Sequence, residues 1–130
     1  MILCNMKTDF SLCRLILYVQ DVTLLSSFYT GHFGLTCIES IPGEWAVLQS
    51  GSFELALHLA GPAYRGSASG AGSNAKIVFE TGQDLNMLRE RLVSAGVLMG
   101  NIKSYEGFTY KLLDGTDPEG NVFQLMQKIQ

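Results

Sequence analysis

The side chains able to do acid–base or ionic chemistry alternate with apolar residues along short, β-prone runs. Glu54 and His58 stand four positions apart in one such run and so share a face of the predicted strand. A carboxylate can act as a general base, and an imidazole can accept a proton or donate to a ligand. The sequence places no serine, cysteine or second histidine to form a relay with His58. We therefore expect this face to bind a ligand, with Glu54 as the possible base.

The same alternation separates two faces on each of four runs. In the first run, Leu15, Leu17 and Val19 make an unbroken apolar face, which leaves the intervening residues on the other side. The corresponding polar-containing faces are Arg14-Ile16-Tyr18, Glu54-Ala56-His58, Lys76-Val78-Glu80 and Gln124-Met126. We expect the apolar faces to meet helices and the polar-containing faces to line a trough. Trp45 and Tyr110 are further candidates for its wall, since small-molecule sites are mostly apolar with a few convergent polar groups.

The predicted elements that position these residues repeat one order twice. The first half contains strands at 14–19, 35–41, 44–50 and 52–59, and a helix at 22–32 that begins after Asp21 and ends before Gly34. The second half contains strands at 75–81, 97–104, 108–113 and 121–128, and a helix from about 84 that ends at Gly96. The fold is thus α+β, a single domain over 1–130. It comprises a first βαβββ module at 14–59, a flexible Gly-, Ala- and Ser-rich connector at 60–74 and a second module at 75–128.

Composition narrows the class of protein. The chain has 130 residues, 47% of them hydrophobic and 16% charged, a balance that excludes disorder, collagen-like repeats and coiled coils. A net charge of −3 with no basic run argues against a nucleic-acid partner. No apolar stretch reaches the roughly 18 uncharged residues of a membrane span. The three cysteines lack paired metal spacing, and we expect reduced, partly buried thiols in a cytoplasmic protein with no membrane partner.

The repeated order and its landmark motifs resemble those of a known family. The motifs are, in order, Asp21-Val22, Phe28-Tyr29, Gly34-Leu35, Asp117-Pro118-Glu119-Gly120-Asn121 and Phe123-Gln124-Leu125. From Arg14 to Lys128 the chain resembles the vicinal oxygen chelate superfamily, which includes glyoxalase I, bleomycin-resistance proteins and extradiol dioxygenases. The resemblance implies that the two modules form a curved mixed sheet with helices on its outer face. The modules would pair within one chain or by swapping between two chains.

The resemblance also implies where a metal ion would bind. Metal-dependent relatives place one ligand in the first strand and one in the last strand of each half, and the matching positions here are Arg14, Glu54, Lys76 and Gln124. Arginine and lysine cations have no lone pair to give a metal at neutral pH. We therefore expect no cofactor and no metal ligands, with a divalent metal as the alternative. Arg14 and Lys76 would instead neutralise Glu54, and Gln124 would complete the hydrogen bonds. The other interpretation is that both cations are ordinary solvated charges.

Three functions follow from the resemblance. The favoured one is a metal-independent glyoxalase/bleomycin-resistance-like protein, acting as a homodimer, that binds or sequesters a small, partly aromatic or anionic molecule in the trough. The alternatives are a metal-dependent glyoxalase- or dioxygenase-type enzyme and a protein-interaction module. The sequence leaves open whether the chain is an enzyme and favours a binding protein. The expected ligand-binding residues are Arg14, Tyr18, Trp45, Glu54, His58, Lys76, Tyr110, Gln124 and Met126.

Overall fold

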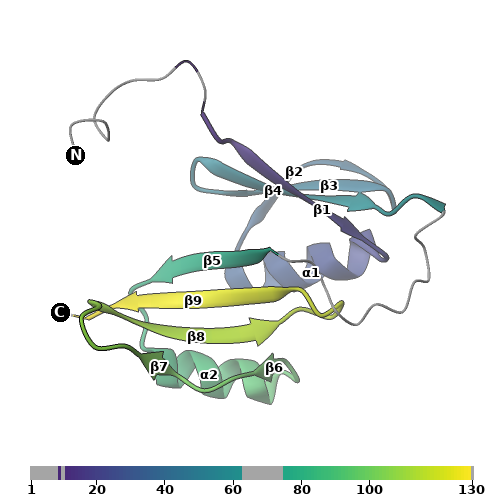
Figure 1. Cartoon of the computed structure of the whole chain (residues 1–130). Helices are drawn as coiled ribbons and strands as arrows, with labels where there is room; N and C mark the ends of the chain where they lie inside the picture. Colours follow the sequence, from purple (N-terminus) through teal and green to yellow (C-terminus); the bar gives the residue numbers. More distant parts are fainter. Residues whose placement is uncertain (1–8, 10, 63–74, 130) are drawn as a thin grey trace.

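The first half of the chain forms a four-stranded mixed sheet. The computed structural model describes Asp9, residues 11–62 and residues 75–129. The strands of this first sheet are β1 Arg14–Val19, β2 Thr36–Ile41, β3 Trp45–Ser50 and β4 Phe53–Leu59. They lie in the order β1-β4-β3-β2, with β1 parallel to β4 and the other neighbours antiparallel (Figure 1). The last strand of the unit thus lies beside the first.

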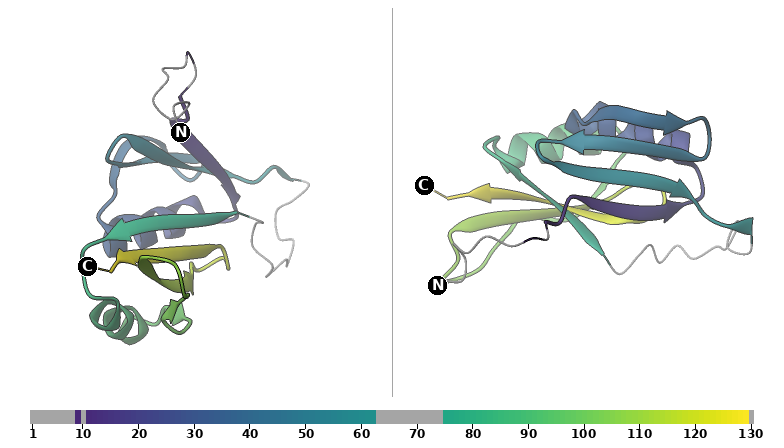
Figure 2. Two further views of the ribbon diagram at one scale, coloured as in Figure 1. Left: turned by 60° about the vertical axis from the view of Figure 1, so that its left-hand side comes forward. Right: turned by 90° about the horizontal axis from the view of Figure 1, so that it is seen from above.

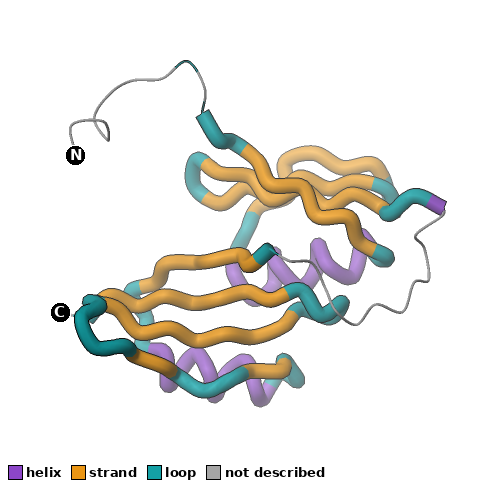
Figure 3. The backbone as a smooth tube through the Cα atoms, in the orientation of Figure 1, coloured by secondary structure: helices purple, strands orange, loops and turns teal. Residues whose placement is uncertain are grey.

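The second half repeats this topology in a separate sheet. Its strands are β5 Lys76–Thr81, β6 Leu98–Met99, β7 Lys103–Ser104, β8 Tyr110–Thr116 and β9 Val122–Lys128. The order is β5-β9-β8-β6, with β7 also paired to β8 and β5 parallel to β9. The described strands therefore form two mixed sheets of matching topology, which Figure 3 shows as distinct layers. This confirms the predicted α+β class and the duplicated order.

Two capped helices cover the sheets in the described part of the chain. α1 spans Val22–Phe33 and α2 spans Leu85–Ser94. The Asp21 carboxylate accepts a hydrogen bond from the Leu24 N–H at 2.9 Å, and Asp84 caps α2 in the same way. Gly34 ends α1 with φ +72°, the left-handed conformation that glycine adopts most easily. Neither described helix is long and apolar enough to cross a membrane.

The segment between α2 and β8 differs from its prediction. The pattern predicts one strand over 97–104, but two short strands form there. Met99 pairs with Gly115, whereas Lys103 pairs with Leu112, so this side of the ladder contains one residue more than β8 does. An extra residue of this kind bends a strand and breaks its pairing. β8 also continues to Thr116, three residues past the predicted end at 113, which brings Asp114 into the sheet.

α1 joins the two units, because it packs on the first sheet and its aromatic residues also reach the second. Phe33 stacks on Phe79 of β5 with ring centroids 4.7 Å apart, and it meets Phe123 of β9 edge-on at 5.0 Å. Core residues of both sheets and both helices form one cluster. The views in Figure 2 show α1 alongside the second sheet as well as under the first. The core is therefore shared between the units.

A buried polar contact fixes the turn between β8 and β9 onto α1. Asp117 is only 4% exposed, and its carboxylate accepts a hydrogen bond from the Tyr29 hydroxyl at 2.7 Å. The Asn121 N–H also donates to this carboxylate, at 2.9 Å. Burial, reinforced by the negative charge and hydrogen bond of Asp117, raises the pKa of Tyr29 above its usual range. The phenol therefore stays protonated and keeps donating.

The same turn also contacts the start of α1. The Gly120 N–H donates to the Asp117 carbonyl at 2.9 Å, the hydrogen bond that closes a β-turn over 117–120. The Glu119 carboxylate accepts hydrogen bonds from the backbone N–H groups of Gln20, at 2.8 Å, and Asp21, at 2.7 Å. A negative charge is stabilising at this end of a helix. The landmark motif of the second unit thus holds both the middle and the beginning of the helix of the first.

Replacing Tyr29 with phenylalanine removes one hydrogen bond to a buried carboxylate without leaving a large cavity. We expect Tyr29→Phe to lower the free energy of unfolding by about 1.5–3 kcal/mol, the range for hydrogen bonds to charged groups. Urea unfolding followed by circular dichroism measures this change. Tyr18→Phe is the control, since Tyr18 is 69% exposed. Equal stability of the two variants would contradict the importance of the buried contact.

Candidate functional site

Arg14 and Glu54 form an ion pair on the face of the first sheet opposite the core. The parallel register of β1 and β4 pairs these residues directly. The Arg14 Nε donates to Glu54 Oε1 at 2.8 Å, and Nη2 lies 2.7 Å from the same oxygen. Both side chains are partly exposed, at 33% and 23%. The predicted contact between these residues is therefore present, at a position that solvent and a ligand can reach.

An aromatic row made of Tyr18, His58 and Trp45 continues from this ion pair along the same face. The Tyr18 and His58 ring centroids are 5.0 Å apart, and those of His58 and Trp45 are 5.7 Å apart. The guanidinium carbon of Arg14 lies 5.6 Å from the centroid of Trp45, a cation–π distance. The three rings are inclined to one another, by 44° for Tyr18 and His58 and by 84° for His58 and Trp45, and Arg14 of the ion pair lies beside Trp45.

Hydrogen bonds hold two members of the aromatic row. The Trp45 Nε1–H donates to the Glu39 carboxylate at 2.8 Å. His58 Nδ1 lies 2.7 Å from the Leu59 carbonyl oxygen. Because a carbonyl only accepts, Nδ1 carries the proton and Nε2 of the neutral ring is an acceptor. Trp45 and His58 also line a hollow of about 410 Å³ together with Glu39 and Glu44, so that end of the row is acidic.

A second polar cluster lies on the second sheet. Lys76 Nζ donates to Asp114 Oδ2 at 2.9 Å, and Gln124 Nε2 donates to Asp114 Oδ1 at 2.9 Å. Burial on its own would raise the pKa of Asp114. The hydrogen bonds from Lys76 and Gln124, together with the charges of Lys76 and Lys103, outweigh burial and lower that pKa below its usual value. Asp114 is therefore a carboxylate whose two oxygens both have partners.

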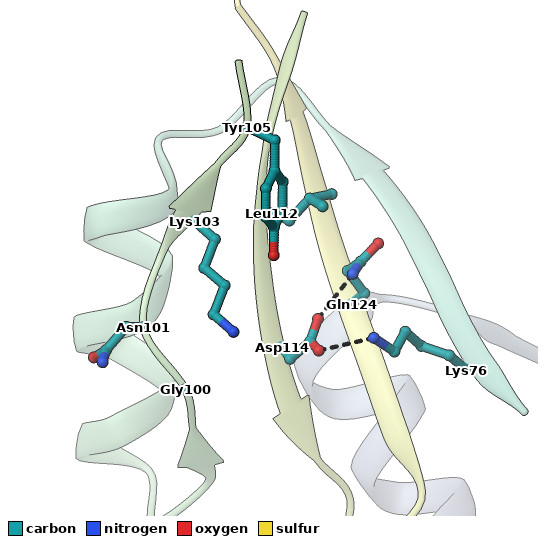
Figure 4. Close-up of a pocket in the computed structure, with 8 residues that line it drawn as sticks. All are labelled: Lys76, Gly100, Asn101, Lys103, Tyr105, Leu112, Asp114 and Gln124. Atoms are coloured by element: carbon teal, nitrogen blue, oxygen red, sulfur yellow. Dashed lines mark hydrogen bonds and ion pairs between the residues drawn. The ribbon is translucent and has the colours of Figure 1, made fainter. Parts of the chain in front are cut away.

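This cluster lies in a pocket of about 410 Å³, the second-sheet pocket (Figure 4). Its lining residues are Lys76, Gly100, Asn101, Lys103, Tyr105, Leu112, Asp114 and Gln124. They come from β5, β8, β9 and the segment between α2 and β8. The volume lies within the range of small-molecule sites. The Gly100 N–H donates to the Asp114 carbonyl at 2.8 Å and fixes the wall opposite β9.

The structure corrects the expected single cluster. Lys76 and Gln124 contact Asp114 and not Glu54, so two separate groups replace one. The sequence reasoning missed Asp114 because the predicted strand ended at 113. Had that strand been extended to 116, alternation would have placed Asp114 on the face of Gln124, its pairing partner in β9.

The remaining sequence-predicted residues lie on the expected faces. Tyr110 and Met126 are partly buried and share the face of Asp114 and Gln124 by alternation along β8 and β9. Their contact with a ligand stays a prediction. Cys13 and Cys37 are free but exposed, so the expected partial burial is wrong for both. Cys4 and residues 63–74 of the predicted connector lie outside the described residues.

The donor set does not fit a metal ion of the kind that the resemblance implies. Two of the four matching positions carry cations: the Arg14 guanidinium occupies the Glu54 oxygen that a metal would need, and the Lys76 ammonium pairs with Asp114, outside the four positions. Within the described ranges, no group of three or more His, Cys, Asp or Glu side chains is placed to hold a metal. Divalent transition metals select neutral imidazole, thiolate and free carboxylate ligands, which these positions lack.

Sequence comparison identifies the family to which this geometry belongs. The family profile of the Glyoxalase/Bleomycin resistance protein/Dioxygenase superfamily matches residues 11–125. The chain therefore belongs to this superfamily. A search of curated proteins found no significant match.

Solved structures share the fold at low sequence identity. A lactoylglutathione lyase from Agrobacterium tumefaciens is 18% identical, with a TM-score of 0.73 over 93% of this chain and 96% of the other. TnmS3, an antibiotic binding protein from Streptomyces sp. CB03234, is 20% identical, with a TM-score of 0.72 over 94% and 99%. The fosfomycin resistance protein FosX from Listeria monocytogenes is 17% identical, with a TM-score of 0.67 over 94% of each chain. An enzyme and a binding protein thus share this fold.

The lowered pKa of Asp114 predicts a dependence of stability on pH. A carboxylate with a lowered folded-state pKa contributes stability above its unfolded pKa of about 3.9, and the contribution is lost as pH falls through the folded value. We expect Asp114→Asn to be less stable than the wild type at neutral pH and to lose less stability on acidification. Urea unfolding between about pH 2 and 7 measures both slopes. Asp9→Asn controls for net charge, and parallel curves for wild type and Asp114→Asn would contradict the prediction.

Proposed function

We propose that this protein binds a small, partly aromatic or anionic molecule without a metal ion. The observation that carries the proposal is the exposed aromatic row beside the fixed Arg14–Glu54 pair. Tyr18 is 69% exposed although its strand contributes buried residues to the core on the other face. Exposed aromatic rings with polar groups beside them suit edge and face contacts with a partly aromatic ligand. TnmS3 is an antibiotic binding protein of the same fold, which supports a binding role.

Independence from metal is supported by the chemistry of the four positions. Arg14 and Lys76 carry fixed charge where metal-dependent relatives would need lone pairs, and each already pairs with a carboxylate. A divalent ion that binds Glu54 or Asp114 has to displace the cation already paired with that carboxylate. The ion then repels the displaced cation, which opposes metal binding. Glu54, the possible base, is held by the guanidinium. We therefore favour a binding protein over a metal-dependent enzyme. The cytoplasmic location stays a prediction.

A homodimer is also part of the proposal. The Arg14–Glu54 pair lies on the first sheet, and the cluster around Asp114 lies on the second. None of the hydrogen bonds or ion pairs among the described residues joins the two clusters. Among the described strands, β1 and β5 each pair with a single neighbour, so each lies at the edge of its sheet. A second copy would bring the first sheet of one chain to the second sheet of the other, which completes two equivalent sites by symmetry.

Trp45 is the single tryptophan of the chain, so it reports directly on the aromatic row. We expect N-phenyl-1-naphthylamine, a neutral aromatic probe, to quench Trp45 emission on binding. Tyr18→Leu should weaken this binding about 3- to 10-fold, the value of one aromatic contact. Phe53→Leu, an exposed aromatic residue on the other face of β4, is the matched control. Unchanged affinity in Tyr18→Leu would place the ligand elsewhere.

Metal titration of the same preparation tests the metal-independent part. We expect Mn, Fe, Co, Ni and Zn, added one at a time to chelator-treated protein, to leave the melting temperature and probe affinity unchanged. A ligand that binds only the folded state raises stability by mass action, so a bound metal would be visible. A stoichiometric metal that raises the melting temperature would overturn this part and favour the enzyme alternative.

The dimer predicts that probe binding depends on protein concentration. In the proposed dimer, each site takes one wall from the first sheet of one chain and the other wall from the second sheet of its partner. We therefore expect the amount of N-phenyl-1-naphthylamine bound per chain to follow the fraction of dimer. Sedimentation velocity and probe fluorescence over one dilution series measure the two quantities together. Monomers that bind the probe at full stoichiometry would contradict a site shared between chains.

A further inference from the structure

The second-sheet pocket has two donor side chains with no partner among the described residues, whereas each oxygen of its carboxylate already accepts a hydrogen bond. Both oxygens of Asp114 accept from Lys76 and Gln124. Lys103 has no carboxylate within ion-pair distance among the described residues, and the Tyr105 hydroxyl has no hydrogen-bond partner among them. Figure 4 shows both side chains directed into the pocket toward Asp114. The pocket therefore offers two solvent-exposed donors that an added acceptor can bind without breaking a contact within the described residues.

The charge of the pocket has the matching sign. Two lysines and one aspartate line it, which leaves one uncompensated positive charge in a chain whose net charge is −3. The net charge of the pocket lining is therefore positive, although the net charge of the chain is negative. A partly enclosed pocket strengthens the interaction of such a cation with an anion relative to open solvent.

The backbone explains why these two donors converge. Lys103 lies in β7, and Tyr105 follows two positions later, so their side chains leave the chain on the same side. The extra residue between β6 and β7 sets the register in which Lys103 pairs with Leu112. Leu112 itself lines the pocket and supplies an apolar surface beside the donors. The Lys103 ammonium, the Tyr105 hydroxyl and the Leu112 side chain therefore line the same pocket.

We propose that Lys103 and Tyr105 form the anion-binding end of the ligand site, for a planar aromatic molecule carrying one carboxylate or sulfonate. This inference rests on the proposed function and assigns the class of ligand. In the dimer proposed above, the ring of the ligand lies on the aromatic row of one chain, and its anion accepts from the Lys103 ammonium and the Tyr105 hydroxyl of the other chain. The hollow beside Trp45 and His58 is lined by Glu39 and Glu44, and these carboxylates repel an anion, so the anionic group of the ligand points away from that hollow.

A matched pair of probes tests the charge directly. 8-Anilinonaphthalene-1-sulfonate is an aromatic anion, and N-phenyl-1-naphthylamine is the same ring system without the sulfonate. We expect Lys103→Met to weaken binding of the sulfonate about tenfold or more, as for loss of a charge-assisted hydrogen bond, and to change binding of the neutral probe less than about twofold. Tyr105→Phe should weaken the sulfonate about 2- to 10-fold, as for a neutral hydrogen bond.

Lys111→Met is the control variant, because it removes the same charge from β8 on the face opposite the pocket. We expect it to change neither probe's affinity beyond about twofold, as is usual for surface substitutions. Circular dichroism and the melting temperature establish that every variant is folded. Titrations of the full chain by probe fluorescence, with Trp45 quenching as a second readout, give the affinities.

The outcomes separate this inference from the proposed function. If Lys103→Met weakens both probes equally, or Lys111→Met weakens the sulfonate as much as Lys103→Met, the anion-binding end is overturned while ligand binding stands. If the wild type binds neither probe at protein concentrations where the dimer is present, the proposed function falls together with the inference. Selective loss of the sulfonate in folded Lys103→Met supports both.

Discussion

The hydrogen bond from Tyr29 to the buried Asp117 is the contact on which the arrangement of the two units depends. It joins the middle of α1 to the turn between β8 and β9, across 88 positions of the sequence. Asp117 is buried, and an unpaired carboxylate at that place would cost several kcal/mol. The Tyr29 hydroxyl adds a partner from the first unit to those that the turn itself supplies to Asp117, and this ties the turn to α1. Since α1 also packs on β3 and β4, the position of one sheet fixes that of the other.

This contact helps explain why the two units of the repeat share one hydrophobic core. Each βαβββ unit has its own sheet, helix and caps, and local signals specify these almost completely. What local signals leave open is the relation between units. Here the aromatic contacts of Phe33 and the carboxylates of Asp117 and Glu119 supply it. The landmark motif thus has a structural role that is separate from ligand binding.

The sequence predicted the elements well because their signals are local. Alternation identified β1, β4, β5 and β9 to within one residue, and Asp21 with Gly34 bounded α1. The contact of Arg14 with Glu54 was predicted from the resemblance, which matches both residues to metal-ligand positions, and the parallel register brings the two together. The partner of Lys76 did not follow, because it depends on where β8 ends and on how β8 pairs with β9. Cross-strand partners are a property of register, and one residue of register changes the face of every side chain.

The same limit applies to the second-sheet pocket. Lys103 and Tyr105 stand in a stretch whose pattern suggests a continuous strand, and the added residue between β6 and β7 is visible only in the ladder. The two polar clusters are equivalent in position within the repeated units but opposite in character. The cluster on the first sheet lies beside the aromatic row and an acidic hollow, whereas the second-sheet pocket has a net positive charge. Duplication has kept the framework and allowed the two faces to diverge.

The interrupted pairing of β6 and β7 has a consequence for how such a protein changes over time. Gly100 and Asn101 lie outside the strands, and Lys103, Ser104 and Tyr105 are exposed, so substitutions at Asn101 and at 103–105 disturb little of the shared core. Arg14 and Glu54, by contrast, stand in a continuous ladder beside buried residues. The wall that carries the unpaired cation is thus the part of the site most free to vary. A family built on this fold can acquire new ligands through that wall while the helix, the turn and the aromatic row stay as they are.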